Sequence, residues 1–198
     1  MSVEVEERVL GATERLLAEG TPYTQLGVSE ISTAAGIARS TFYVHFDDKG
    51  DLLLRLSRRA TEDVRDALHG WWVQREPAAT VSLTDGMLRV IDAYRRHAGV
   101  LAAVEEVAAY DPAIAGRWRA WIDQYARRLR VRLRAEGVPV APASEADLDT
   151  AAFIVVWSIE RTVSEHVRAT TPITDLALAR SLSQFTSAAL LGTTVWAA

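Results

Sequence analysis

The sequence of 198 residues predicts an all-α protein. Apolar residues recur at helical spacing along most of the chain, and no stretch alternates with a period of two for long enough to predict a sheet. Glycine and proline interrupt this pattern at intervals that suit the ends of helices. Apolar residues make up 49% of the chain, so a core can form without disulfides or metal ions.

Three short helices are expected near the amino terminus, over about residues 4–18, 28–35 and 39–46. The first ends at Gly20, which is followed by Pro22. A glycine at position 36 suits the left-handed residue that closes a helix, and Ile37 can then fill the angle between the second and third segments. This pattern is typical of a helix-turn-helix.

Six further helices are expected over about residues 49–72, 81–97, 100–109, 112–136, 145–169 and 174–191. Asp47 and Asp48 are candidate caps for the first of these, and Pro77 marks the loop after it. The later breaks fall at residues 97–99, 111–112, 137–142 and 170–172. The nine expected helices divide into an amino-terminal head, residues 1–46, and a larger body, residues 47–198.

The composition excludes several classes of protein. No apolar run reaches the roughly 18 residues that a membrane span needs, and five glutamates in the first 20 residues are wrong for a signal peptide. The protein is therefore expected to be soluble and cytoplasmic. It has no cysteine, and its four histidines are not spaced as a helical zinc site, so neither a metal nor another cofactor is expected.

The charge is distributed unevenly along the chain. The formal net charge is −4, and residues 1–49 contain four basic residues against eight acidic ones. The net count alone argues against nucleic acid as a partner. Binding depends on where individual charges lie, however, so the positions of Arg39 and Lys49 carry more weight than the sum.

The third segment carries side chains that can read DNA bases. In a helix-turn-helix, the second short helix lies in the major groove with its first residues at the base edges. Here those residues are Arg39, Ser40 and Thr41. Arg39 can donate two hydrogen bonds to guanine O6 and N7, and Thr41 can offer a hydroxyl to a base or a methyl to thymine.

Three more residues are placed to contact the DNA backbone. Phe42 and Phe46 are four apart and expected to point inward, so Tyr43 and His45 lie on the flanks of the helix, where polar side chains reach phosphates. Lys49 begins the next helix, where a phosphate would gain both its charge and free backbone N–H groups.

The stretch from Val28 to Leu53, VSEISTAAGIARSTFYVHFDDKGDLL, resembles the amino-terminal signature of the TetR family of bacterial repressors. The resemblance implies operator contacts by Ser40, Thr41, Tyr43, His45 and Lys49, with Arg39 beside them. The chain length and the nine-helix layout agree with this family. The body is more weakly similar to the mycobacterial ethionamide-resistance repressor, around residues 121–125 and 159–162.

The head departs from the family pattern at three places. Glutamates at positions 4, 6 and 7 replace a basic arm, so no help in DNA binding is expected from this arm. Gly27 stands near a common Ser or Thr cap, and Gly50 replaces a common glutamate. Neither glycine should abolish folding, because glycine at a cap costs only about a few tenths of a kcal/mol relative to those residues.

The last two expected helices are apolar on more than one face, for example at Phe153, Ile154 and Val155. A homodimer that pairs these helices with their symmetry mates is the expected arrangement, as in the resembled family. A central helix buried in a monomer is the alternative. A dimer supplies two heads, which predicts a palindromic operator.

Together with the family resemblance, aromatic residues in the body predict a pocket for a small molecule, although each one taken alone is more typical of a core. The expected lining residues are Met87, Tyr94, Trp118, Trp121, Ile122, Tyr125, Phe153, Val156, Trp157, Glu160 and Phe185. Tyr125 and Glu160 are the polar candidates, and Glu160 can instead form an ion pair at the rim of a dimer. The asparagines expected in an ethionamide-type pocket are replaced here by Val156 and Ile159, which favours an apolar or aromatic effector.

These observations predict a ligand-responsive transcriptional regulator, a repressor released from DNA by its effector. Catalysis is not expected, because Ser164, Glu165 and His166 point in different directions on one helix and no glycine-rich phosphate loop is present. Two alternatives remain for the head. It can be a plain helical bundle, or part of a dimer that binds a small molecule or a partner but no longer reads DNA.

Overall fold

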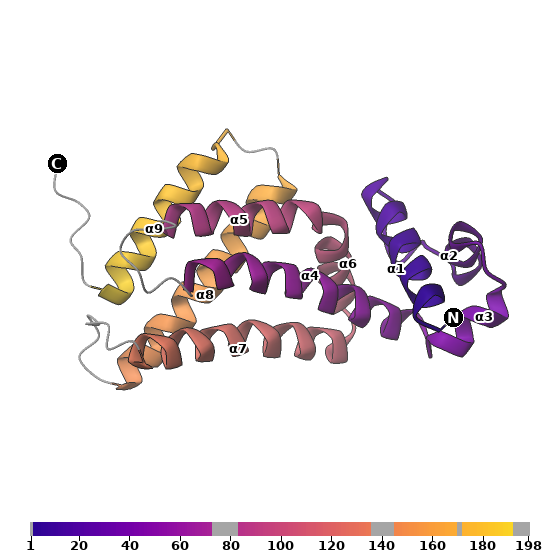
Figure 1. Ribbon diagram of the computed structural model, residues 1–198, viewed down its shortest axis with the longest axis horizontal. Helices are drawn as coiled ribbons and strands as arrows, with labels where there is room; N and C mark the ends of the chain where they lie inside the picture. The colour runs from indigo at the N-terminus through magenta and orange to yellow at the C-terminus, as the bar shows by residue number, and fades with distance from the viewer. Residues whose placement is uncertain (1, 73–82, 136–144, 170–171, 192–198) are drawn as a thin grey trace. The chain divides into compact units, whose positions relative to one another are not determined.

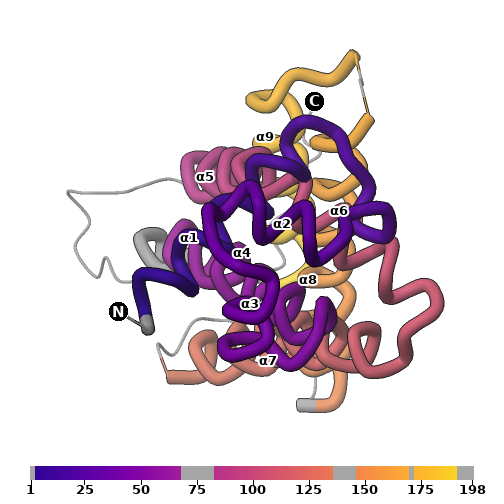
Figure 2. The backbone as a smooth tube through the Cα atoms, turned by 90° about the vertical axis from the view of Figure 1, so that its right-hand side faces the viewer, coloured from indigo at the N-terminus to yellow at the C-terminus, as the bar shows by residue number. Residues whose placement is uncertain are grey.

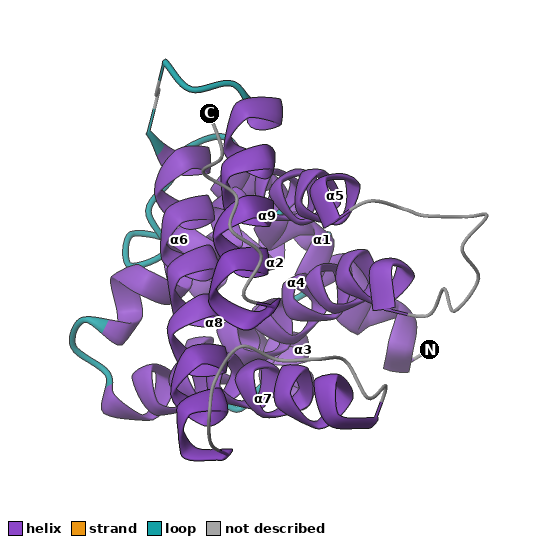
Figure 3. Ribbon diagram, turned by 90° about the vertical axis from the view of Figure 1, so that its left-hand side faces the viewer, coloured by secondary structure: helices purple, strands orange, loops and turns teal. Residues whose placement is uncertain are grey.

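The computed structural model describes residues 2–72, 83–135, 145–169 and 172–191. Within these ranges every regular element is a helix, as Figure 3 shows, so the all-α prediction is confirmed. The helices are α1 (Ser2–Ala18), α2 (Val28–Ala35), α3 (Arg39–His45), α4 (Lys49–Trp72), α5 (Leu83–Arg96), α6 (Ala98–Ala108), α7 (Pro112–Ala135), α8 (Glu145–Arg168) and α9 (Asp175–Leu191). None of the described helices is long and apolar enough to cross a membrane.

Most helices begin and end within two residues of the expected positions, but the break predicted at residues 97–99 is wrong at Gly99. His97 is the cap, and α6 already begins at Ala98. A Cβ added to Gly99 would lie 2.9 Å from the Cβ atom of Leu17. The glycine therefore lets α6 approach α1 closely and does not end a helix. The loops predicted near Pro77 and over 137–142 lie outside the described residues.

The chain forms two compact units, and the first comprises residues 1–65 and 93–118. Within it α1 packs against α2, α3 and α6, and the first three helices can be followed by their labels in Figure 1. This packing follows from the apolar stripe of α1, which buries Val9, Ala12 and Leu17. The largest fully buried side chains around it include Ile31, Phe42, Phe46, Leu52, Leu53 and Val104.

The second unit comprises residues 66–92 and 119–198, so α4, α5 and α7 contribute residues to both units. Within it α8 packs against α9. One buried cluster joins three helices of this unit, with Leu129 and Leu133 from α7, Leu148, Ala152 and Val155 from α8, and Leu190 from α9. One apolar face of each of these helices is buried in this core.

Candidate nucleic-acid interface

The turn between α2 and α3 has the geometry of a helix-turn-helix. Gly36 ends α2 in the left-handed conformation, with φ 64° and ψ 40°. The Gly36 N–H donates to the Thr33 carbonyl and the Ile37 N–H donates to the Ser32 carbonyl, each at 3.0 Å. This pair of bonds satisfies carbonyls at the end of α2 and turns the chain sharply toward α3 (Figure 2). The expected role of Gly36 is confirmed.

The recognition helix α3 has a buried side and an exposed side. Phe42 and Phe46 are 0% and 1% exposed, and their rings stack with centroids 5.1 Å apart. Arg39, Ser40 and Tyr43 are exposed on the helix. The two phenylalanines therefore anchor α3, as expected, and the polar residues at its start are left accessible to a partner.

The predicted DNA contacts on α3 fall into two groups. The guanidinium carbon of Arg39 lies 5.9 Å from the centroid of the Tyr43 ring, so these two exposed residues are close together, with Ser40 next to Arg39. Thr41 and His45 are half-buried on the flanks of the helix. The accessible surface at the start of α3 thus combines a guanidinium group, a hydroxyl and a phenol, which are groups that bind base edges and phosphates.

Lys49, the sixth predicted contact, is held in the first unit by Tyr23. Its Nζ atom donates to the Tyr23 carbonyl at 2.8 Å and lies 4.8 Å from the centroid of the Tyr23 ring. The Tyr23 hydroxyl in turn donates to the Lys49 carbonyl. Burial lowers the pKa of the Lys49 ammonium, and the nearby Glu106 carboxylate partly offsets this. An ammonium has three donors, so two are left for a phosphate.

The start of α4 is capped by an aspartate. The Asp48 side chain accepts a hydrogen bond from the Asp51 N–H at 2.8 Å, which confirms Asp48 as a cap. The same group occupies one of the N–H positions at which a phosphate was expected. A phosphate near Lys49 would therefore approach a carboxylate as well as an ammonium, and Lys49 must supply the attraction.

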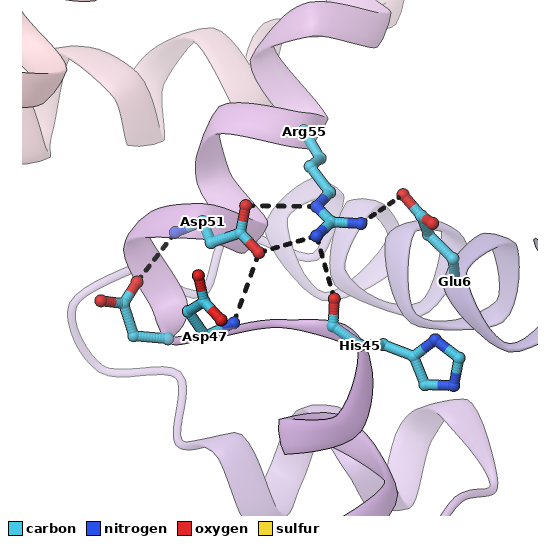
Figure 4. A network of polar contacts seen from close by, with 6 residues as sticks. Glu6, His45, Asp47, Asp51 and Arg55 are labelled. Carbon is cyan, nitrogen blue, oxygen red and sulfur yellow. Dashed lines mark hydrogen bonds and ion pairs between the residues drawn. The ribbon is translucent and has the colours of Figure 1, made fainter. Parts of the chain in front are cut away.

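The acidic residues of α1 form ion pairs with α4. A Glu6 oxygen lies 2.9 Å from the Arg55 guanidinium (Figure 4), and a Glu7 oxygen lies 3.1 Å from that of Arg59. Glu14 is 3.9 Å from Arg59. No contribution from this acidic arm was expected. The structure shows that α4 balances much of its charge locally, so the negative count of residues 1–49 overstates the repulsion that DNA would meet.

One carboxylate of α6 holds the segment between α1 and α2. Glu106 accepts hydrogen bonds from the Tyr23 N–H at 3.1 Å and the Thr24 N–H at 3.3 Å, and also from the Thr24 hydroxyl. Tyr23 is 3% exposed, and its burial raises the pKa of its phenol. Glu106 and Tyr23 thereby fix the carbonyl to which Lys49 is bonded.

Comparison with known proteins agrees with this geometry. Residues 9–56, which include the whole helix-turn-helix and the start of α4, match the family of bacterial regulatory proteins of the tetR type. This amino-terminal segment of the chain is therefore similar to the DNA-binding part of TetR-family regulators. Members of this family are DNA-binding transcriptional regulators and not enzymes.

Solved structures with the same fold extend over the rest of the chain. A TetR-family transcriptional regulator from Streptomyces coelicolor has a TM-score of 0.71 and 21% identity, covering 94% of this chain and 80% of that one. A protein classed as a transcriptional regulator from Saccharomonospora viridis, in complex with choline, has a TM-score of 0.70 and 16% identity over 96% and 98% of the two chains. A transcriptional regulator from Rhodococcus has a TM-score of 0.69 and 16% identity over 92% and 94%. No curated protein matches the chain significantly.

The residues predicted to line a TetR-type effector pocket belong to both units. Tyr94 and Trp118 are in the first unit, and the remaining nine are in the second. Met87, Ile122 and Glu160 are buried in the second unit, with exposures of 3%, 0% and 7%. The half-buried members of the set are Trp118, Trp121, Tyr125, Val156 and Trp157.

Several of these aromatic rings contact one another within the second unit. The Trp121 and Tyr125 rings meet edge to face with centroids 4.8 Å apart. The Trp157 indole N–H donates to an Asp123 carboxylate oxygen at 3.1 Å, and the Arg119 guanidinium lies 5.6 Å from the Trp157 ring. α7 and α8 therefore hold aromatic faces together with charged groups, a combination that suits planar or cationic small molecules.

Two of the predicted pocket residues lie on the surface of the single chain. Phe153 and Phe185 are 47% and 41% exposed, and Ile154 and Leu176 on the same two helices are similarly exposed. These four residues are called here the exposed apolar set of α8 and α9. Their placement favours contact with another protein surface over a wall of an interior pocket.

The polar residues that hold the head together were not predicted from the sequence. Arg8, Arg55 and Glu106 bind partners that are 27 to 83 residues away along the chain. The only local signal was the spacing of Asp51 and Arg55, which are four apart on α4 and form an ion pair at 2.9 Å. Among the described residues, no group of acidic or histidine side chains is arranged to hold a metal ion.

Proposed function

We propose that this protein is a ligand-responsive transcriptional repressor that binds a palindromic operator as a homodimer and releases it when a small apolar or aromatic effector binds. Residues 1–46 form the DNA-binding part, and residues 47–198 carry the effector site and the dimer contact. The observation that carries the proposal is the recognition helix, which buries Phe42 and Phe46 and leaves Arg39, Ser40 and Tyr43 exposed at its start.

The homodimer is supported by the exposed apolar set of α8 and α9. Exposure of four large apolar side chains on two adjacent helices is unfavourable in water, and their burial in a protein contact would lower the free energy. A two-fold dimer places two identical recognition helices on one DNA face. They read successive major grooves when they lie about 34 Å apart, which makes the operator palindromic.

The release step is argued from linkage. If the effector binds more tightly to a dimer whose heads do not fit the operator, it shifts the population toward that state and DNA dissociates. Helix α4 contributes residues to both units, so it is the element proposed to carry this change. The coupling is reciprocal, so saturating operator must weaken effector binding by the same factor.

The effector class is argued from the aromatic rings of α7 and α8. Trp121, Tyr125 and Trp157 offer ring faces to a flat apolar molecule. The related structure with bound choline adds a quaternary ammonium to the compounds worth testing, because such cations also bind to aromatic faces. Glu160, a buried carboxylate on α8, would suit a cation.

The test is a polarisation titration of the purified protein against DNA fragments recovered by a genome-wide binding selection, at two salt concentrations. Arg39→Ala is expected to relax base preference at one position of each half-site, and Lys49→Ala to weaken all sequences alike. Arg127→Ala, which removes an exposed charge from α7, is the matched control and should change little. If the protein shows no sequence selectivity, the repressor proposal fails and a binding module with an inactive head replaces it.

The effector half of the proposal is tested with the same complex. Planar aromatic compounds and choline are added to the bound operator, and compounds that release DNA are then titrated by calorimetry with and without operator. Equal affinity in both conditions would contradict coupling.

A further inference from the structure

The recognition helix α3 has few features of its own that fix its orientation. It is seven residues long, and its N-cap is Ala38, which makes no side-chain hydrogen bond. A helix this short is not stable alone, because the first turn costs more conformational entropy than its bonds return. Phe42 is the residue that it buries within its own length. The direction of the exposed Arg39 must therefore be set by groups outside α3.

Arg8 of α1 holds the turn that leads into α3. Its Nε and Nη2 atoms donate to the Ala35 carbonyl at 3.0 and 2.7 Å, and Nη2 also donates to the Gly36 carbonyl at 2.6 Å. Carbonyls at the end of a helix lack partners inside the helix and carry the negative end of its dipole. A guanidinium group is thus a strong cap for α2, because its hydrogen bonds are charge-assisted.

Arg55 of α4 holds the opposite end of α3. Its Nη2 atom donates to the His45 carbonyl at 3.0 Å, and its guanidinium carbon lies 4.8 Å from the centroid of the Phe46 ring. Figure 4 shows this guanidinium between the carboxylates of Asp51 and Glu6. One oxygen of each carboxylate lies 2.9 Å from a nitrogen of the guanidinium. Hydrogen bonds to these carboxylates, first Asp51 and then Glu6, raise the pKa of Arg55, so the group stays charged.

We infer that Arg8 and Arg55 are positioning residues for DNA recognition, which fix the two ends of α3 by donating to backbone carbonyls at Ala35, Gly36 and His45. Both depend on α1, since Arg8 belongs to it and Arg55 is paired with Glu6 of the same helix. The acidic arm therefore contributes to recognition indirectly. This inference rests on the proposed DNA-binding function.

The competing explanation is that either arginine binds a DNA phosphate directly. The two roles differ in their dependence on salt. A residue that neutralises one phosphate releases counterions, so its loss reduces the slope of log K against log salt by about one. A residue that only positions α3 leaves this slope unchanged. It lowers affinity for the operator while affinity for unrelated DNA stays the same.

The DNA experiment compares Arg8→Ala and Arg55→Ala with Arg15→Ala, which removes the same charge from an exposed position on α1. Arg8→Ala and Arg55→Ala are each expected to weaken operator binding roughly ten- to hundredfold, the range for loss of hydrogen bonds to a charged group. Arg15→Ala should weaken it less than about threefold. An operator loss no larger than that of Arg15→Ala, or a salt slope reduced by about one, overturns the inference.

Conservative variants separate positioning from general loss of structure. A lysine at position 8 can still donate to both Ala35 and Gly36, so Arg8→Lys should recover most of the affinity. A lysine at position 55 cannot serve His45, Asp51 and Glu6 with the geometry of a planar fork, so Arg55→Lys should recover little. Equal recovery at the two positions would contradict the different contacts seen here.

A measurement without DNA keeps the inference separate from the proposed function. Amide hydrogen exchange of the free protein should show faster exchange over residues 37–46 in Arg8→Ala and Arg55→Ala, with protection of α8 unchanged. If the wild type does not select particular DNA sequences, the exchange rates over residues 37–46 still decide whether Arg8 and Arg55 hold α3. Unchanged exchange over residues 37–46 in both variants overturns the inference.

Discussion

The helix-turn-helix region and the helices α8 and α9 use their side chains in opposite ways. Around α3, polar groups from α1 and α4 bind specific backbone carbonyls, and the apolar residues Phe42 and Phe46 are fully buried. On α8 and α9, Phe153, Ile154 and Phe185 remain exposed. The apolar residues of the first region are covered within one chain, whereas those of the second are exposed, which favours contact with another surface.

The largest expected effect comes from breaking the second region. The double substitution Ile154→Glu with Phe185→Glu places charges in the proposed dimer contact, where burial of an unpaired carboxylate costs several kcal/mol. Sedimentation velocity should show a monomer, with operator affinity reduced at least about a hundredfold because one head is lost. Helix content should stay unchanged, since both side chains are more than 40% exposed in the single chain.

The control for that substitution is Val131→Glu on α7, at a position that is 57% exposed. It adds one such charge at an apolar position outside α8 and α9, so the variant should remain a dimer with normal operator affinity. A dimer that survives the double substitution would mean that the contact lies elsewhere on the molecule.

The next effect comes from Gly36, in the first region. Gly36→Ala should lower the free energy of unfolding by about 1–2 kcal/mol, because left-handed backbone disfavours a side chain. It should also disturb Arg8, whose Nη2 atom would be 2.8 Å from the new Cβ. Urea unfolding and operator titration measure the two parts separately.

Gly20→Ala is the matched control for this change. Gly20 also has a positive φ, 89°, but nothing lies within 4 Å of its Cβ position. The two variants should therefore lose similar stability, and only Gly36→Ala should lose operator affinity. The same loss of affinity in both would contradict a specific role for the Arg8 contact.

The sequence predicted the local features of the head well. Gly36 and the spacing of Phe42 and Phe46 are signals read over a few residues, and both were confirmed. Gly99 was misread, because its role is an approach of 2.9 Å to Leu17 on another helix. A local sequence pattern does not reveal such a contact, because a glycine can either end a helix or allow two helices to pack closely.

The long-range polar contacts were not predictable in the same way. Glu6 and Arg55 are 49 residues apart, and Glu106 and Tyr23 are 83 apart. Charged residues on an amphipathic helix usually face water, so nothing in the sequence singles out those that pair. For the body, periodicity predicted helices with apolar faces but not the buried cluster that α7, α8 and α9 form together. The partner of the exposed Phe153 and Phe185 stays a prediction.

A smaller effect concerns Lys49, the only lysine of the chain. Burial lowers the pKa of its ammonium below the ordinary 10.5, and Glu106 partly offsets this shift. Burial raises the pKa of the neighbouring Tyr23 phenol. As pH rises through the lowered pKa, Lys49 loses its charge and operator affinity falls earlier than for a free lysine. The same shift makes its contribution to folding stability rise with pH, because the unfolded chain then binds more protons.

This opposite pH dependence can be measured on one residue. Carbon NMR of the single lysine gives its pKa, and polarisation titrations across the alkaline range give the affinity. Lys49→Arg keeps its charge throughout and should remove the pH dependence of binding. A Lys49 pKa at or above 10.5 would show that the Tyr23 contact does not desolvate the ammonium.

The smallest expected effect tests how far the arginines of α4 neutralise the negative charge of the acidic arm. Glu7→Gln breaks the exposed pair with Arg59, in which the side chains are 57% and 44% exposed, so stability should change by less than about 1 kcal/mol. Operator affinity should rise less than about threefold, because one negative charge is removed and Arg59 is freed. Glu4→Gln removes a charge that is also exposed. Glu4→Gln should raise operator affinity without changing the unfolding midpoint. A larger gain in affinity for Glu7→Gln than for Glu4→Gln would show that pairing with Glu7 keeps Arg59 from attracting DNA.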